Sequence, residues 1–173
     1  MVLRFYLAVE YFIVTRFLRN GVNPFMHALF RAPIFFYRIG LGGMVGKQIL
    51  LLTTIGRETG KLRVTALGYG YDTASDTYHV MTGWGGKTDW LRNALANPTI
   101  HVRVGARQFD GIAELVSEEQ GMAIMREVAR INRLAPQMWS RLSGIPFDSS
   151  DESLRQLVAY FPSLRLRPSK ARP

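Results

Sequence analysis

The strongest constraint on the fold is a series of short apolar runs joined by very short turns between residues 48 and 116. Most of these runs are rich in β-branched residues or alternate apolar and polar side chains, which is typical of β-strands. Parallel neighbours need crossover connections of about a dozen residues or more, and turns this short cannot provide them. The chain therefore predicts an antiparallel sheet. The expected strands are residues 48–54, 63–71, 77–82, 99–104, 108–116 and 164–167.

Helix signals interrupt the expected strands once and follow them twice. Thr88 is a good N-cap residue for a short helix between two strands. Ser117 and Ser149 each begin a capping-box pattern, with a Gln or Glu three positions later. The first of these helices is expected to reach about residue 134, and the second to end before Pro162. This order of elements indicates an α+β fold whose sheet closes into a small barrel.

The 173 residues fit one domain, although the two ends of the chain differ in character. Helices are expected at residues 3–19 and 24–30, and the glycine-rich stretch 32–46 is expected to form a loop. Residues 1–46 are therefore interpreted as an N-terminal helical segment that packs on or anchors the barrel. Residues 47–173 are interpreted as the barrel domain itself.

Residues 1–19 are rich in Phe, Tyr and Leu but also carry Arg4, Glu10 and Arg16. A membrane-spanning helix needs about 20 apolar residues with few charges, so this segment does not qualify. Two interpretations stay open. One is peripheral contact with a membrane surface, and the other is packing on the barrel or on the second subunit of a homodimer. The expected location is the cytoplasm, either free or peripherally attached to the inner face of the membrane.

The chain is strongly basic, with a formal net charge of +9 at pH 7. Such a charge favours an anionic partner, such as a phosphorylated cofactor, a lipid headgroup or nucleic acid. No nucleic-acid-binding motif is visible, so a nucleic-acid partner is not expected. The absence of cysteine excludes disulfides, thiolate metal sites and cysteine nucleophiles. The three histidines lack the spacing of metal ligands, and no metal site is expected.

The first candidate site is a basic turn bounded by Gly56 and Gly60. Arg57, Lys61 and Arg63 gather around these glycines. Guanidinium groups can form paired hydrogen bonds to phosphate or carboxylate oxygens, and a lysine adds a point charge. Glycines also allow backbone N–H groups to face an anion. The turn is interpreted either as an anion-binding site or as an ordinary basic hairpin turn.

The second candidate site is a glycine-rich loop, Gly83, Trp84, Gly85 and Gly86, which leads into the expected helix after Thr88. A helix N-terminus favours an anion through its free N–H groups and its dipole. Trp84 and Trp90 could stack on a planar ring. Trp90 also fits a core position of the short helix. No acid–base pair or activated nucleophile accompanies either site. This pattern suits an enzyme whose cofactor carries the chemistry.

Two stretches of the chain resemble motifs of the deazaflavin (F420)-dependent nitroreductase family, also described as F420H2-dependent quinone reductases. The first is residues 50–67 (LLLTTIGRETGKLRVTAL) and the second is residues 85–98 (GGKTDWLRNALANP). The resemblance covers roughly residues 48 to 117. It implies an antiparallel split β-barrel of the FMN-binding type that binds reduced F420, whose tail carries a phosphate and glutamates. It also implies hydride transfer to a small-molecule acceptor such as a quinone, a nitro compound or an enone.

The resemblance implies roles for individual side chains. Arg57 and Arg63 would hold the phosphate and carboxylates of the cofactor tail. Thr65 and Ala66 would approach the deazaflavin ring, and the glycine-rich loop would line its other side with Trp90 in support. The residues expected to bind the cofactor are Arg57, Lys61, Arg63, Thr65, Ala66, Met81, Thr82, Gly83, Trp84, Gly85, Gly86 and Trp90.

The chain departs from the sequence pattern of the family at two positions in or beside these motifs. Glu58 stands where a basic residue is usual, and Trp84 stands where a lysine is frequent. Tyr160 is a candidate for the C-terminal tyrosines that shape the acceptor pocket in the nitroreductase. Two alternatives remain open. One is a split barrel that holds FMN or haem through the same arginines, and the other is a non-catalytic module that binds an anion or a membrane.

Overall fold

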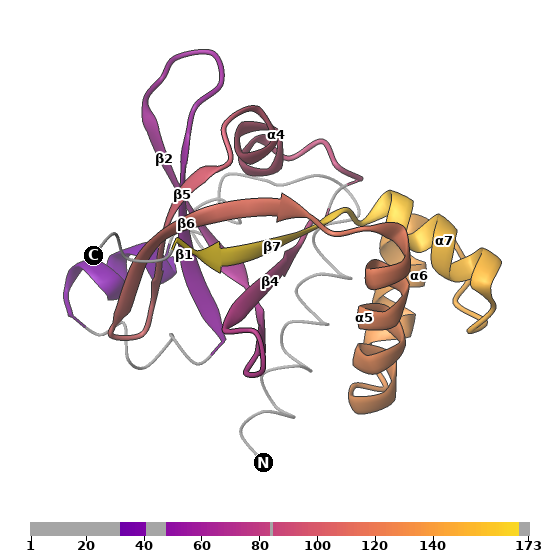
Figure 1. Ribbon diagram of the computed structural model, residues 1–173. Helices are drawn as coiled ribbons and strands as arrows, with labels where there is room; N and C mark the ends of the chain where they lie inside the picture. Colours follow the sequence, from indigo (N-terminus) through magenta and orange to yellow (C-terminus); the bar gives the residue numbers. More distant parts are fainter. Residues whose placement is uncertain (1–31, 41–47, 84, 170–173) are drawn as a thin grey trace.

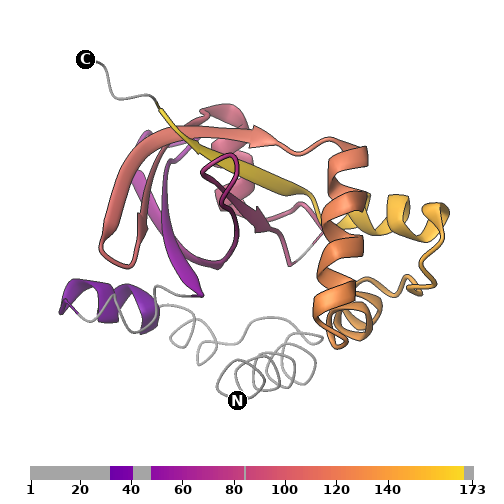
Figure 2. The same cartoon turned by 60° about the horizontal axis from the view of Figure 1, so that its bottom comes forward.

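The computed structural model describes residues 32–40, 48–83 and 85–169. Among these residues, seven strands form one sheet in the order β2-β1-β5-β6-β7-β4-β3, with every neighbouring pair antiparallel. The sheet curls into a half-barrel (Figure 1, Figure 2). The predicted antiparallel α+β barrel is therefore confirmed. The strands are β1 (Ile49–Ile55), β2 (Leu62–Gly68), β3 (Gly70–Asp72), β4 (Thr77–Met81), β5 (Thr99–Val104), β6 (Arg107–Leu115) and β7 (Ser163–Pro168).

The number of strands between residues 62 and 72 differs from the prediction. The single strand expected at 63–71 is two strands, β2 and β3, which are separated at Tyr69. β2 pairs with β1 and β3 pairs with β4, so these two strands form the opposite edges of the sheet. The chain therefore crosses the open side of the half-barrel at Tyr69. Gly68 and Gly70 flank this crossing, and a Cβ at position 70 would have no atom within 4 Å.

Gly111 lies in the middle of β6, but it does not mark a bulge. The pairing of β5 with β6 runs without interruption through Thr99 opposite Ile112 and Ile100 opposite Gly111. A Cβ atom at position 111 would overlap with the backbone carbonyl oxygen of Arg167 in β7. The glycine is therefore needed because two neighbouring strands approach too closely for any side chain.

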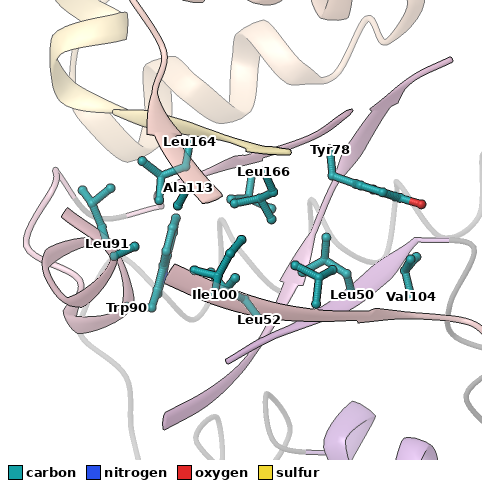
Figure 3. Packing of buried hydrophobic residues seen from close by; sticks show 13 residues of the cluster. Leu50, Leu52, Tyr78, Trp90, Leu91, Ile100, Val104, Ala113, Leu164 and Leu166 are labelled. Carbon is teal, nitrogen blue, oxygen red and sulfur yellow. The ribbon is translucent and has the colours of Figure 1, made fainter. Parts of the chain in front are cut away.

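The main core lies inside the curl of the sheet, where alternate strand residues point inward. Leu50 and Leu52 of β1 are completely buried there. The core is closed at one end by Trp90 and Leu91 of α4 (Asp89–Ala96), while Tyr78 lies toward its other end (Figure 3). Burial of each large apolar side chain stabilises the fold by about 1.5–3 kcal/mol relative to exposure. α4 is thus held against the barrel by its apolar face.

Three helices near the C-terminus form a second layer beside the half-barrel (Figure 1). They are α5 (Glu118–Ile131), α6 (Ala135–Ser143) and α7 (Asp151–Tyr160). Their apolar faces share a separate cluster, in which Met125, Leu154 and Leu157 are completely buried and Trp139 is nearly so. The C-terminal helices therefore stabilise each other as well as packing against the barrel.

The end of α5 and the presence of α6 correct the predicted helix pattern. Ser117 caps α5 as expected, because its Oγ accepts a hydrogen bond of 3.3 Å from the backbone N–H of Gln120. The helix predicted to reach residue 134 ends at Ile131. A second helix, α6, follows after a short turn and carries Pro136 in its first turn, where the missing N–H of proline is tolerated. No sequence pattern predicted α6.

Two further helix starts can be compared with their predicted caps. Thr88 is the N-cap residue of α4 as predicted, but its hydroxyl makes no cap hydrogen bond. The cap of α7 is Ser150 rather than Ser149, and Ser150 accepts a hydrogen bond of 3.1 Å from the N–H of Ser153. Ser149 has φ of +66°, whereas an N-cap residue needs an extended backbone. α7 ends before Pro162, as predicted.

The loop predicted for residues 32–46 is wrong in its first part, because residues 32–38 are helical. The glycines that suggested a loop begin only at Gly40, whose φ of +83° is typical of the residue that ends a helix. The helices predicted at 3–19 and 24–30 lie outside the described residues. Within the described ranges, no helix has both the length and the apolar character needed to cross a bilayer.

Tyr37 attaches the helix at 32–38 to the sheet. Its ring is buried, and its hydroxyl donates a 2.8 Å hydrogen bond to the carbonyl oxygen of Ile49 at the start of β1. The same hydroxyl accepts a 2.9 Å hydrogen bond from the N–H of Gly105 in the β5–β6 turn. The guanidinium group of Arg103 lies 5.2 Å from the centre of the ring. These contacts fix the position of the helix, shown in indigo beside the sheet in Figure 2.

An ion pair joins the β3–β4 turn to the start of β6. Arg107 donates two hydrogen bonds of 2.6 Å to the carboxylate of Asp76. These bonds lower the pKa of Asp76 to about 2. The guanidinium also lies 5.7 Å from the ring centre of Tyr78 and 5.2 Å from that of Phe109. The cation of Arg107 is therefore already engaged within the fold.

Candidate cofactor-binding site

A cavity of about 900 Å³ lies between the helix at 32–38, the β1–β2 turn, β2 and the start of α4. Sites for small molecules and cofactors typically have volumes of about 300–1,000 Å³. Its wall combines apolar side chains with three arginines: Phe35, Leu62, Val64, Arg38, Arg57 and Arg63. A ligand with a flat apolar part and an anionic part matches this combination.

The β1–β2 turn is closed by its own backbone. The N–H of Gly56 donates a 2.8 Å hydrogen bond to the carbonyl of Lys61, and the N–H of Gly60 donates a 2.7 Å bond to the carbonyl of Gly56. Gly60 has φ of +65°, and a Cβ at position 56 would lie only 3.0 Å from Oγ1 of Thr59. The two glycines therefore make the turn possible, and their N–H groups do not face an anion. Anion binding at this turn depends on side chains.

Arg57 connects the turn to α4. Its guanidinium donates hydrogen bonds of 2.9 Å to Asp89 and 3.0 Å to the side-chain oxygen of Asn93, and it forms a 3.1 Å ion pair with Glu58. Asp89 and Asn93 are four residues apart and share one face of the helix. The backbone N–H of Arg57 also donates to the Asn93 oxygen at 3.2 Å. Two carboxylates thus neutralise much of the charge of Arg57, which holds the turn in place.

Arg38 and Arg63 carry the unpaired positive charge of the cavity. Both side chains are exposed, and neither has a hydrogen bond or ion pair with any residue in the described ranges. Arg63 belongs to β2, whereas Arg38 belongs to the helix at 32–38. Unpaired guanidinium groups can bind phosphate or carboxylate oxygens through two parallel hydrogen bonds. An anionic ligand would therefore meet cations from two separate elements.

Trp90 contributes to both the core and the cavity wall. Only 7% of its surface is exposed, and it packs among the buried residues of the barrel. Thr65 lines the same cavity from β2. In contrast, Lys61 and Ala66 are not part of the lining, although they lie on the same hairpin. The predicted residues that meet at the cavity are Arg57, Arg63, Thr65 and Trp90.

The loop before α4 lies against the C-terminal helices. Met81 packs on their apolar cluster, and the N–H of Thr82 donates a 3.1 Å hydrogen bond to the carbonyl of Pro162. A Cβ at position 85 would lie 3.6 Å from the ring of Tyr160, so Gly85 and this ring are close neighbours. Like Lys61 and Ala66, the predicted site residues of this region do not line the 900 Å³ cavity: Met81, Thr82, Gly83, Gly85 and Gly86. Trp84 lies outside the described residues.

A smaller cavity of about 250 Å³ lies between the β3–β4 hairpin and α5. Its arginine, Arg165, forms a 3.0 Å ion pair with Glu114. Burial is the main cause that lowers the pKa of His79, which also lines this cavity, so its ring is neutral near pH 7. This cavity therefore offers less free positive charge than the larger one.

Comparison with known proteins places these features in a family. The sequence profile of the F420H(2)-dependent quinone reductase family matches residues 36–143, which include the cavity-forming turn and α4. The chain belongs to the F420H(2)-dependent quinone reductase family. The resemblance of residues 50–67 and 85–98 to this family is thus confirmed.

Two relatives from Mycobacterium tuberculosis, from strains H37Rv and CDC 1551, are each described as an F420H(2)-dependent quinone reductase. Each is 34% identical to this family member over 86 residues, which represent 44% of this chain and 56% of the relative. The match therefore spans little more than half the length of these relatives.

Solved structures of more distant proteins share the fold. A structure described as an F420-H2 dependent reductase has a TM-score of 0.50 and 20% identity, and the alignment covers 70% of this chain and 95% of that protein. A second, described as a domain-swapped dimer, has a TM-score of 0.50 and 18% identity, with coverage of 78% and 99%. At this level of identity the comparisons support the split-barrel fold of the family member.

The two motifs of this family member are joined by hydrogen bonds of the Arg57 side chain. The first motif supplies Arg57, and the second supplies Asp89 and Asn93 on the facing helix. Sequence reasoning did not identify Asn93, whose side chain is buried and whose oxygen accepts two hydrogen bonds from Arg57. Asn93 lies four residues after Asp89, and this spacing could have indicated that both side chains share one face of the helix. Arg38 was also missed, because it lies outside both motifs.

Proposed function

We propose that this family member is an F420H2-dependent reductase that transfers a hydride from the reduced deazaflavin to a quinone. Nitro compounds and enones are further candidate acceptors. The observation that carries this proposal is the cavity of about 900 Å³, on which the turn of the first motif and the helix of the second motif both lie. A ring with an anionic tail matches its apolar and cationic walls.

The residues around the cavity fit an F420 molecule. The unpaired guanidinium of Arg63 and the partly neutralised guanidinium of Arg57 suit a phosphate.

Each part of the protein has a separate task in this proposal. When bound, the reduced deazaflavin supplies the hydride. Arg63 and the partly neutralised Arg57 would hold the phosphate of the tail, and Arg57 also keeps the turn at a fixed distance from α4. Thr65 lies on the wall that the ring would approach, and the exposed apolar side chains of Phe35, Leu62 and Val64 offer a surface on which the ring would pack. The protein thus binds and orients, and no side chain needs to act as acid or base.

The cellular location of the enzyme, its partners and the role of residues 1–19 stay predictions from the sequence. We propose a cytoplasmic enzyme with a small-molecule acceptor and no nucleic-acid partner. Peripheral membrane contact through residues 1–19 would place the enzyme at the membrane, where a lipid-soluble quinone is dissolved. Homodimer formation is the other role proposed for this segment.

Direct binding and turnover measurements test the proposed function. Purified protein is expected to change the fluorescence of F420 at micromolar protein concentration. It should also catalyse oxidation of reduced F420 by menadione, observed as return of the absorbance of oxidised F420. A nitroaromatic compound and an enone, offered in parallel, define the acceptor class. Unchanged F420 fluorescence, together with protein that is isolated yellow with FMN or red with haem, would contradict the proposal.

A further inference from the structure

The helix at 32–38 brings a cation to the cavity from outside both family motifs. Arg38 follows Tyr37, whose hydroxyl is hydrogen-bonded to the start of β1 at 2.8 Å and to the β5–β6 turn at 2.9 Å. Because Tyr37 is buried and fixed on the sheet, the next residue also has a defined position. Arg38 and Ile34 are one helical turn apart, and both line the cavity.

The charges of the cavity lining leave two arginines for a ligand. Glu58 and Asp89 both form ion pairs with Arg57. Arg38 and Arg63 have no such partner among the described residues. They stand on different elements, the helix at 32–38 and the edge strand β2. A long ligand with several separated anionic groups would use both elements.

We propose that Arg38 binds the glutamate carboxylates of the F420 tail, while Arg57 and Arg63 of the turn hold its phosphate. This inference rests on the proposed function. It assigns to the helix at 32–38 the recognition of tail length, a property distinct from binding of the ring or the phosphate. Arg38 also supplies positive charge to a cavity that is lined by Glu58 and Asp89 as well.

Titrations with two ligands test this assignment. One ligand is F420 with several glutamates, and the other is the same deazaflavin with its phosphate but without glutamates. Arg38→Ala is expected to weaken binding of the glutamate-bearing form by about fivefold, since exposed ion pairs contribute modestly. Binding of the glutamate-free form should stay unchanged. Alanine preserves the helix, and Arg38→Lys should retain most of the affinity because the charge remains.

The controls separate this inference from the proposed function. Arg133→Ala removes an exposed arginine outside the cavity and should leave both affinities unchanged. If the wild-type protein binds neither ligand, the proposed function and the role of Arg38 are both wrong. If the wild type binds both ligands but Arg38→Ala has no effect, or weakens both equally, only the glutamate assignment is wrong. Added salt should reduce the difference between wild type and Arg38→Ala.

Discussion

Replacement of both Arg57 and Arg63 by alanine is expected to weaken binding of F420 by about 3 kcal/mol, or roughly a hundredfold. Each charge-assisted hydrogen bond contributes about 1.5–3 kcal/mol. The lower end applies here, because Asp89 and Glu58 already neutralise part of the charge of Arg57. Fluorescence titration of F420 with the double variant measures this loss directly.

The single variants distinguish the two arginines. Arg63→Ala removes an unpaired charge and should weaken binding without loss of stability. Arg57→Ala should also destabilise the protein, because it leaves the buried Asn93 side chain without its partner. Arg133→Ala serves as the control for the loss of one positive charge. Full affinity for F420 in the Arg57→Ala, Arg63→Ala protein would remove the turn from the binding site.

Gly111→Ala is expected to lower the free energy of unfolding by about 3 kcal/mol, toward the upper end of the usual cost of overpacking. The added Cβ would overlap with the carbonyl oxygen of Arg167, and a backbone carbonyl in a paired strand cannot move aside as a side chain could. For a protein of this size the midpoint of thermal unfolding should fall by roughly 6–12 °C. Thermal and denaturant unfolding, followed by circular dichroism, provide the measurement.

Gly70→Ala is the matched control for this prediction. Gly70 also lies in a strand, β3, but a Cβ at this position has no atom within 4 Å. Its replacement should change stability little or increase it slightly, since alanine restricts the unfolded chain. Equal stability of the Gly111→Ala and Gly70→Ala proteins would mean that the approach of β6 to β7 does not require glycine.

The local features of the barrel could be predicted from the sequence, because they depend on neighbouring residues. Strand 99–104 was predicted with its observed limits, since alternation is visible within six residues. The Ser117 cap was also predicted, because the capping box lies within four residues. The need for glycine at position 111 could not be predicted, because its cause is β7, a strand that begins about fifty residues later, and no local pattern contains that information.

The candidate site was predictable only in part, for the same physical reason. Arg57 and Arg63 stood out in a short basic turn, whereas the hydrogen bonds that hold Arg57 come from Asn93, 36 residues away. Arg38 lines the cavity because Tyr37 is attached to the start of β1 and to the β5–β6 turn. These long-range contacts depend on the curled shape of the sheet. The predicted roles of the glycine-rich loop and of Lys61 stay predictions.

A crystal structure of the protein with bound F420 would show which side chains contact the tail of the cofactor. We predict that the phosphate of the tail lies within hydrogen-bond distance of the Arg63 guanidinium, in the cavity between the β1–β2 turn and α4. The ring should lie toward Thr65. A tail bound elsewhere, for example in the smaller cavity beside His79, with Arg63 left in solvent, would contradict this account.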